Sequence, residues 1–387
     1  MPKANCTYSL LALACALCLS GTAFSQEAWF LLPRAGSHSS LVAMTADGAV
    51  QNIAELGFAV SYGESQNAMA FLSSNGHGTS TLDVIGKSSR QTALSLPLDK
   101  GAIPKLSGVE RSIAMTDDFA YFAVFHAPLT PKPTPLSKNE LGGVFDFIQV
   151  SLHSGEVTSL PLPPDCVSPT VVDFNGTPLV FAYNAYGVWK FDPSSKSLQR
   201  LVSKEDLDDV LTEECSAFHC GGFRPQTWAE YVGVPGAGVF RLSQLGSLDQ
   251  VLDAKLELVH PPRPTLQLGL GDPDVGLSPG TFAGSPAIAI FQVNEVIGAK
   301  TLTYVEARSL SVRWHTTLPQ GKGPGSPRVQ AWPNGAIFVN SETKTVEEIS
   351  PTETHTLWSL NPMAPMLSPA DGPYALTGAF MVWTTAR

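Results

Sequence analysis

Charge, long apolar runs and linear catalytic motifs are all scarce in this chain. Only 15% of the 387 residues are charged, and 34 acidic residues against 24 basic ones give a net charge of −10. An acidic chain without a basic cluster argues against nucleic acid or anionic lipid as a partner. Beyond residue 25 no apolar run is long enough to cross a bilayer, so we expect no transmembrane segment.

Familiar catalytic signatures are missing as well. The sequence has no H-E-x-x-H pair and no Walker loop. This excludes the linear signatures of zinc peptidases and P-loop nucleotide enzymes. The eight histidines are scattered, and such histidines are more often surface or satisfied core residues than ligands or bases.

The first 25 residues have the pattern of a secretory signal peptide. Lys3 gives a positive start, Leu10–Leu19 an apolar core, and residues 23–25 (AFS) a small-x-small cleavage site before Gln26. The apolar core is too short for a membrane anchor. The residues before Cys15 and Cys18 match the lipobox that precedes a lipid-modified cysteine poorly. We expect a secreted or periplasmic protein whose mature chain is residues 26–387.

Glycine, proline and short apolar runs are abundant, as in a turn-dense β protein. The stretch Val171–Val202 contains four such runs separated by turn clusters. Gly187–Asp192 alternates between its two faces like a half-exposed strand. Pro178–Tyr183 is apolar on both faces, like a strand covered on both sides. The stretch therefore predicts one four-stranded antiparallel sheet.

Similar units recur along the chain. We place a polar turn between the two outer strands of each unit near Asp47, Ser88, Ser154, Ser195, Gly246, Ser309 and Pro351. Seven turns in the predicted mature chain correspond to about 52 residues per unit, the size of a four-stranded propeller blade with loops. We predict an all-β propeller of about seven blades in a single domain, residues 26–387.

The two ends of the mature chain complement each other. Trp29–Leu32 and Leu41–Thr45 open a first unit that lacks an innermost strand, while the strands predicted at Tyr374–Thr377 and Ala379–Thr384 have no unit of their own. We predict that the C-terminal segment completes the first blade, which also hides exposed sheet edges.

The run of turn-separated strands, and the stretch Pro333–Ser350 (PNGAIFVNSETKTVEEIS) in particular, resembles the seven-bladed NHL, YVTN and quinoprotein-like propellers. The resemblance is one of pattern over most of residues 27–387. It implies the fold and carries over no functional residue, because propellers host many unrelated activities.

That fold implies a loop-rich face. In such propellers the connection between second and third strands and the link to the next blade emerge on the same side. We assign Pro128–Gly143 to the first kind, and Ser203–Gly222 and His260–Ser285 to the second. Loops on a rigid scaffold commonly carry binding residues; the alternative is that these are tolerated insertions.

Four residues are candidates for ligand contacts. Arg224 and Trp228 lie near the entry of unit five and could line the channel mouth. Asp272 and Asp274 alternate on a glycine-bounded loop and could supply oxygens to Ca²⁺; the alternative is a Pro-Asp turn that caps its own backbone.

Three cysteines lie in the predicted mature chain. Cys215 and Cys220 are the simplest disulfide pair in an oxidising compartment, which leaves Cys166 free or paired elsewhere. The alternative is a metal site formed with His219, but a fourth ligand is not evident in the sequence. We predict the disulfide and no metal there.

Two functional classes follow. The favoured one is a non-catalytic monomer that binds a protein, glycan or peptide through its loop-rich face. The alternative is a metal-dependent hydrolase, lyase or lactonase-like enzyme with its site at the channel mouth. A quinone cofactor is a weaker third idea, and no cofactor beyond possible Ca²⁺ is indicated.

Overall fold

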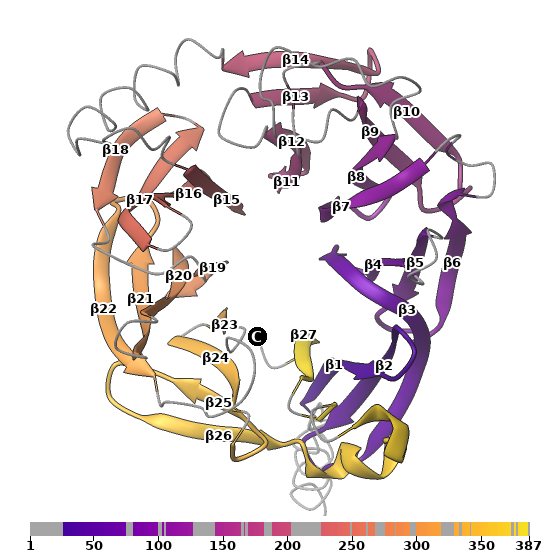
Figure 1. Cartoon of the computed structure of the whole chain (residues 1–387), viewed down its shortest axis with the longest axis vertical. Coiled ribbons are helices and arrows are strands. Elements are labelled where there is room, and N and C mark those ends of the chain that lie inside the picture. The colour runs from indigo at the N-terminus through magenta and orange to yellow at the C-terminus, as the bar shows by residue number, and fades with distance from the viewer. Residues whose placement is uncertain are drawn as a thin grey trace, which may run out of the picture.

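The computed structural model shows a ring of antiparallel sheets (Figure 1). It describes residues 26–74, 80–99, 103, 106–126, 144–163, 166, 169–181, 188–202, 226–247, 250–260, 262–267, 275–282, 284–294, 299–318, 329–332, 335–340, 342–372, 375–376 and 378–385. In these residues 27 strands form one seven-stranded and five four-stranded sheets.

The seven-stranded sheet consists of two blades that share one strand. Blade one has the order β27 (Phe380–Thr384), β1 (Glu27–Arg34), β2 (His38–Thr45) and the first half of β3 (Val50–Glu64). From Phe58 onward β3 pairs with β4 instead and becomes the innermost strand of blade two. The chain therefore passes from the outside of one blade to the inside of the next without leaving the strand.

The remaining strands complete seven blades, each ordered from the inside outward. Blade two continues with β4 (Ala68–Ser74), β5 (Ser80–Gly86) and β6 (Thr92–Pro97). Blade three is β7 (Leu106–Met115), β8 (Phe119–His126), β9 (Val144–Ser151) and β10 (Val157–Pro161). Blade four is β11 (Thr170–Phe174), β12 (Thr177–Phe181), β13 (Val188–Asp192) and β14 (Ser197–Val202), the four strands predicted in Val171–Val202.

The last three blades follow the same order. Blade five is β15 (Gln226–Val234), β16 (Gly238–Ser247), β17 (Gln250–His260) and β18 (Pro262–Gln267). Blade six is β19 (Val275–Phe282), β20 (Ser285–Asn294), β21 (Ala299–Glu306) and β22 (Ser311–Leu318). Blade seven is β23 (Val329–Trp332), β24 (Gly335–Asn340), β25 (Thr345–Ile349) and β26 (Thr354–Ser359).

Burial falls from the inside of a blade to its outside. The second strands β12 and β24 are almost entirely buried, whereas most residues of the outermost strands β6 and β26 are exposed. A second strand has neighbouring blades against both faces and so must be apolar on both. This confirms the predicted burial pattern.

The predicted ring closure is confirmed. Strand β27 pairs antiparallel with β1, for example Ala28 with Thr384 and Leu31 with Phe380. Two short 3-10 helices, η3 (Asn361–Met366) and η4 (Pro369–Asp371), lie in the link that leads from β26 to β27. The prediction of a second strand at Tyr374–Thr377 is wrong in this link, because Ala375 and Leu376 form a turn.

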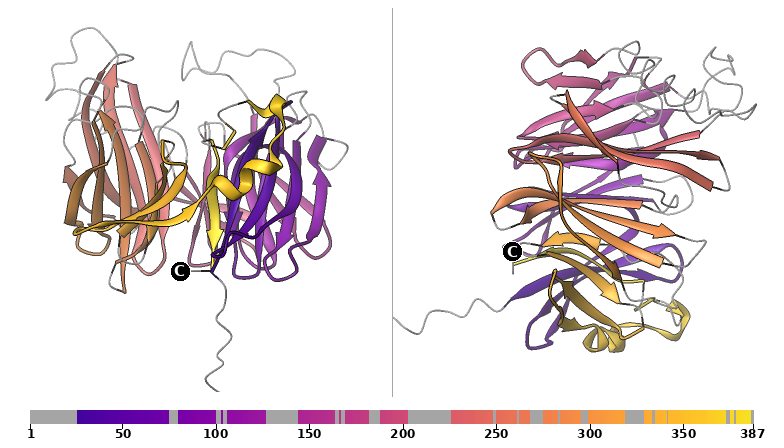
Figure 2. Two further views of the ribbon diagram at one scale, coloured as in Figure 1. Left: turned by 90° about the horizontal axis from the view of Figure 1, so that it is seen from below. Right: turned by 90° about the vertical axis from the view of Figure 1, so that its left-hand side faces the viewer.

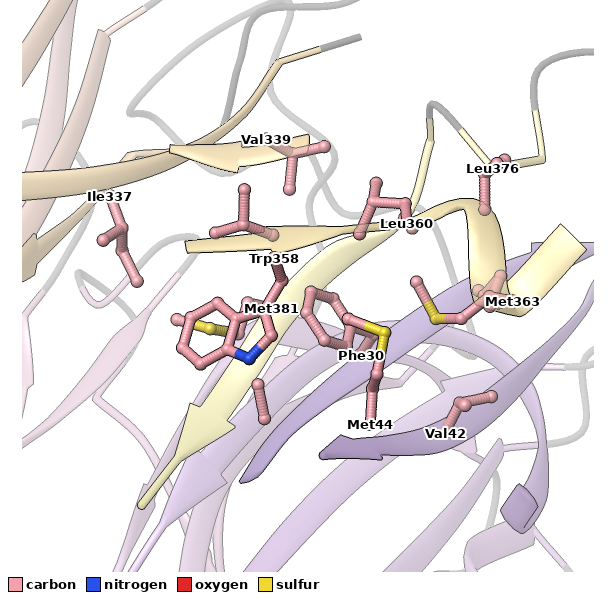
Figure 3. Packing of buried hydrophobic residues seen from close by; sticks show 14 of the residues in the cluster. Phe30, Val42, Met44, Ile337, Val339, Trp358, Leu360, Met363, Leu376 and Met381 are labelled. Atoms are coloured by element: carbon pink, nitrogen blue, oxygen red, sulfur yellow. The ribbon is translucent and has the colours of Figure 1, made fainter. Parts of the chain in front are cut away.

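An apolar cluster seals the join between blades seven and one. Phe30 of β1, Trp358 of β26, Met363 of η3 and Met381 of β27 are all buried in it (Figure 3). Its residues come from both ends of the chain, so burial of their apolar surface stabilises the contact between the two ends.

Two other predictions fail in blades five and six. Gly246 lies inside β16 rather than in an outer turn, because β16 and β17 are long and the outer connection falls at residue 261. His260–Ser285 is not a single link, since it contains β18 and β19. The prolines at the start of this segment favoured the prediction of a loop. The segment instead forms β18, an outermost strand, where a proline without an N–H is tolerated.

Within the described residues, no helix combines the length and apolar character needed to cross a membrane.

Candidate functional site: the loop face

The two faces of the ring carry very different connections. One face, which we call the turn face, carries two kinds of connection in each blade: from the first strand to the second, and from the third strand to the fourth. None of these connections between described strands exceeds five residues. At the other, the loop face, the described strands end where the links between blades and the connections between second and third strands begin, including those at 127–143, 203–225 and 360–379. The C-terminus lies at the turn face (Figure 2).

Asp146 is the centre of a polar cluster near the loop face, in blade three. Its Oδ2 lies 3.2 Å from Nε2 of His126, and Ser159 donates a 2.6 Å hydrogen bond to the same oxygen. The three residues come from β8, β9 and β10 and occupy diagonal cross-strand positions, so they share one face of the sheet. The His126 and Asp146 side chains are 16% and 19% exposed.

This arrangement orients an imidazole at the last residue of β8, where the long connection to β9 begins. A carboxylate fixes the ring and its tautomer, and such a ring can bind a polar ligand group or transfer a proton. Ser159 donates its hydrogen bond to the carboxylate, whereas in a nucleophilic triad the hydroxyl bonds to the imidazole, so the order differs from that of a triad.

A second polar cluster anchors the link between blades seven and one to the loop face. Arg34 donates a 2.6 Å hydrogen bond to the Met366 carbonyl, and its Nε lies 3.4 Å from Asp371 Oδ1. Asp371 also accepts from the Ala35 and Ser368 N–H groups, which together lower the pKa of its carboxyl. The cluster is a structural clamp on this link.

The innermost strands are joined to one another by side chains. Gln330 of β23 donates hydrogen bonds to the Met381 carbonyl on β27 and to the Tyr62 hydroxyl on β3, so it connects blades seven, one and two. Ser112 accepts from the Val171 N–H, and Ser278 from the Ala331 N–H. These bonds connect the innermost strands of neighbouring blades.

The candidate residues chosen from the sequence remain predictions. Arg224, Asp272, Asp274, Cys215 and Cys220 lie outside the described residues. The backbone of Trp228 is in β15, an innermost strand, near the strand end at the loop face. Its side chain is outside the described part. Cys166 is buried in the cluster between blades three and four.

The pairing of His126 with Asp146 was not predicted. The alternation of Val144–Ser151 and the apolar run ending at His126 indicate two strands. Their register is set across residues 127–143, however, and the sequence does not specify which residues face each other over such a distance. Among the described residues, no group of three or more histidine, cysteine or acidic side chains is placed to hold a metal ion.

Comparisons with known proteins support the fold. No protein-family model and no curated protein matches the chain. Among solved structures, Pyrococcus horikoshii acylaminoacyl peptidase is 12% identical with a TM-score of 0.50, covering 88% of this chain and 52% of the peptidase. This chain thus spans about half the length of that enzyme.

Two further structures are covered almost completely. AztD from Citrobacter koseri is 11% identical with a TM-score of 0.48, covering 86% of this chain and 94% of that one. The β-propeller domain of the Trilobed protease from Pyrococcus furiosus is 10% identical with a TM-score of 0.49, again covering 86% and 94%. At such identities the likeness concerns fold alone. The chain is a β-propeller, and its narrower resemblance to NHL or YVTN proteins stays a prediction.

Proposed function

We propose that this protein is an exported, single-domain propeller that binds a peptide or glycan ligand through its loop face. The observation that supports the proposal is the asymmetry between the two faces. Between the described strands, every connection longer than five residues starts and ends on the loop face, while those on the turn face are short. Long connections on a rigid frame are typical of binding surfaces.

The frame beneath the loop face is well suited to hold such a surface. The apolar cluster around Phe30 closes the ring, and side-chain hydrogen bonds join the innermost strands. A rigid support reduces the ordering cost of binding. His126 and Asp146 add an oriented polar pair at the edge of this face.

Export is compatible with where the described strands start. The first strand begins at Glu27, whose N–H donates to Thr385 and whose carbonyl accepts from Thr384 Oγ1. Cleavage before Gln26 would therefore leave every described strand intact.

The test compares residues 26–387 with two matched variants on peptide and glycan arrays. In the first, residues 128–143 are replaced by a short Gly-Ser linker; in the second, the blade-four turn at residues 193–196 on the turn face is replaced by a turn of equal length. A ligand retained by the wild type should bind about tenfold or more weakly to the loop variant and equally well to the turn variant.

Equal thermal stability of the three proteins is the control for folding. The proposal is refuted if no array component binds, or if binding depends on the turn face and not on residues 128–143.

A further inference from the structure

A two-residue turn on the turn face combines a tight hairpin with an acceptor sequence for glycosylation. Asn175 and Gly176 connect β11 to β12, and the flanking residues Phe174 and Thr177 are paired. Both turn residues have positive φ, 53° and 76°. An Asn-Gly pair with these angles is the preferred type I′ hairpin turn, so the local sequence is fully explained as a turn.

The same residues have a second chemical meaning. Asn175-Gly176-Thr177 has the form N-x-T with a residue other than proline in the middle, the pattern read by enzymes that attach N-linked glycans. Within residues 26–387 the sequence contains this pattern once. Turn formation requires no threonine after the glycine. Thr177 begins β12, where a β-branched residue is favoured, and it also completes the pattern.

The environment of Asn175 leaves its amide nitrogen available for modification. Asn175 and Gly176 are exposed, and a Cβ built on Gly176 would meet no atom within 4 Å. The side chain contacts the Gly236 N–H, 3.4 Å away in the turn between β15 and β16. Because that N–H is a donor, the accepting atom is Oδ1, whereas a glycan is carried on Nδ2.

We propose that Asn175 is an N-glycosylation site, an inference that rests on the export proposed above. In the transfer, the Asn175 Nδ2–C1 bond forms while the bond between C1 and the phosphate oxygen of a lipid-pyrophosphate-linked oligosaccharide breaks. The lipid pyrophosphate leaves, and the amide proton passes to a base of the transferase. The glycan emerges on the turn face and leaves the loop face unobstructed for its ligand.

The test uses the full chain with its own leader, produced in a eukaryotic secretory host and recovered from the medium. Wild type should lose apparent mass on treatment with peptide-N-glycosidase, and mass spectrometry of the peptide should show conversion of Asn175 to aspartate. Asn175→Asp and Thr177→Ala should abolish the mass change, while Thr177→Ser retains it. Asn175→Asp keeps an oxygen acceptor for the Gly236 N–H and tolerates positive φ, so it is the control for folding.

Exported wild type with unmodified Asn175 would overturn the site, as would a mass change that survives Asn175→Asp. Failure to appear in the medium also overturns the inference, and points to the export proposal as the step that fails. Ligand binding by the loop face is measured separately on residues 26–387 and is unaffected by either result.

Discussion

Asp83 and Asp47 show how position within a blade decides the behaviour of a carboxylate. Asp83 lies on β5, where burial raises the pKa of its carboxyl and the Ser95 and Ser73 hydroxyls offset only part of the rise. Asp47 lies in an exposed turn, where hydrogen bonds from the Thr45 hydroxyl and then the Ala49 N–H lower its pKa.

These opposite shifts predict opposite pH dependences. With a raised folded-state pKa, Asp83 destabilises the fold increasingly as pH rises from its unfolded to its folded pKa. Asp47, with a lowered pKa, contributes stability that is present above its unfolded pKa and is lost as pH falls through its folded value. From pH 3 to pH 7, the Tm of Asp83→Asn minus wild type should therefore increase, and that of Asp47→Asn minus wild type should decrease.

Thermal unfolding of the three proteins at intervals of pH makes this measurement, and each variant serves as the other's control. Parallel trends for the two variants would contradict the assigned environments.

At the scale of elements, the packing of innermost strands depends on glycine at points of close approach. A Cβ built on Gly233 of β15 would lie 2.0 Å from the Asp173 carbonyl oxygen on β11. One on Gly63 of β3 would lie 3.0 Å from the Ile113 carbonyl oxygen on β7. Neighbouring blades thus meet backbone to backbone, and a side chain in either position would push them apart.

Alanine at these two glycines should destabilise the protein unequally. Overpacking costs about 1–3 kcal/mol; we expect Gly63→Ala near the lower end and Gly233→Ala at or above the upper end. Urea unfolding of both variants gives the values. Equal stabilities, or a larger loss for Gly63→Ala, would show that the blades adjust more freely than these distances indicate.

At the scale of the whole molecule, ring closure makes the two ends of the chain interdependent. Deletion of residues 372–387 removes β27 and with it the buried Met381 and Val382. The cooperative unfolding transition should be lost, because blade one would lack its innermost strand. The milder variant Met381→Ala should cost about 2–5 kcal/mol. Calorimetry measures both, and an unchanged Tm of the truncated protein would disprove closure as a source of stability.

Metal dependence is also a property of the whole protein. If the binding face requires no metal, we expect the same Tm with and without EDTA. A metal bound only to the native state would raise the Tm, and its removal would lower it. A fall in Tm that Ca²⁺ restores, and that Asp272→Asn with Asp274→Asn abolishes, would instead support the calcium site and reopen the metal-dependent alternative.

The sequence by itself determined what depends on neighbouring residues. Alternation and turn residues predicted β11 to β14 and most outer turns, and the unpaired apolar runs at the two ends predicted the closure by β27. Two of the predictions that failed, at Gly246 and in His260–Ser285, concern segments where long strands or an edge proline obscure the local pattern.

Only the tertiary structure decided which residues meet across long connections. His126 and Asp146 are joined through β8 and β9, and Gln330 connects three blades, because register and ring closure bring distant positions together. Such contacts depend on the summed packing of all seven blades, whereas a turn such as Asn175-Gly176 depends on the backbone preferences of its own residues.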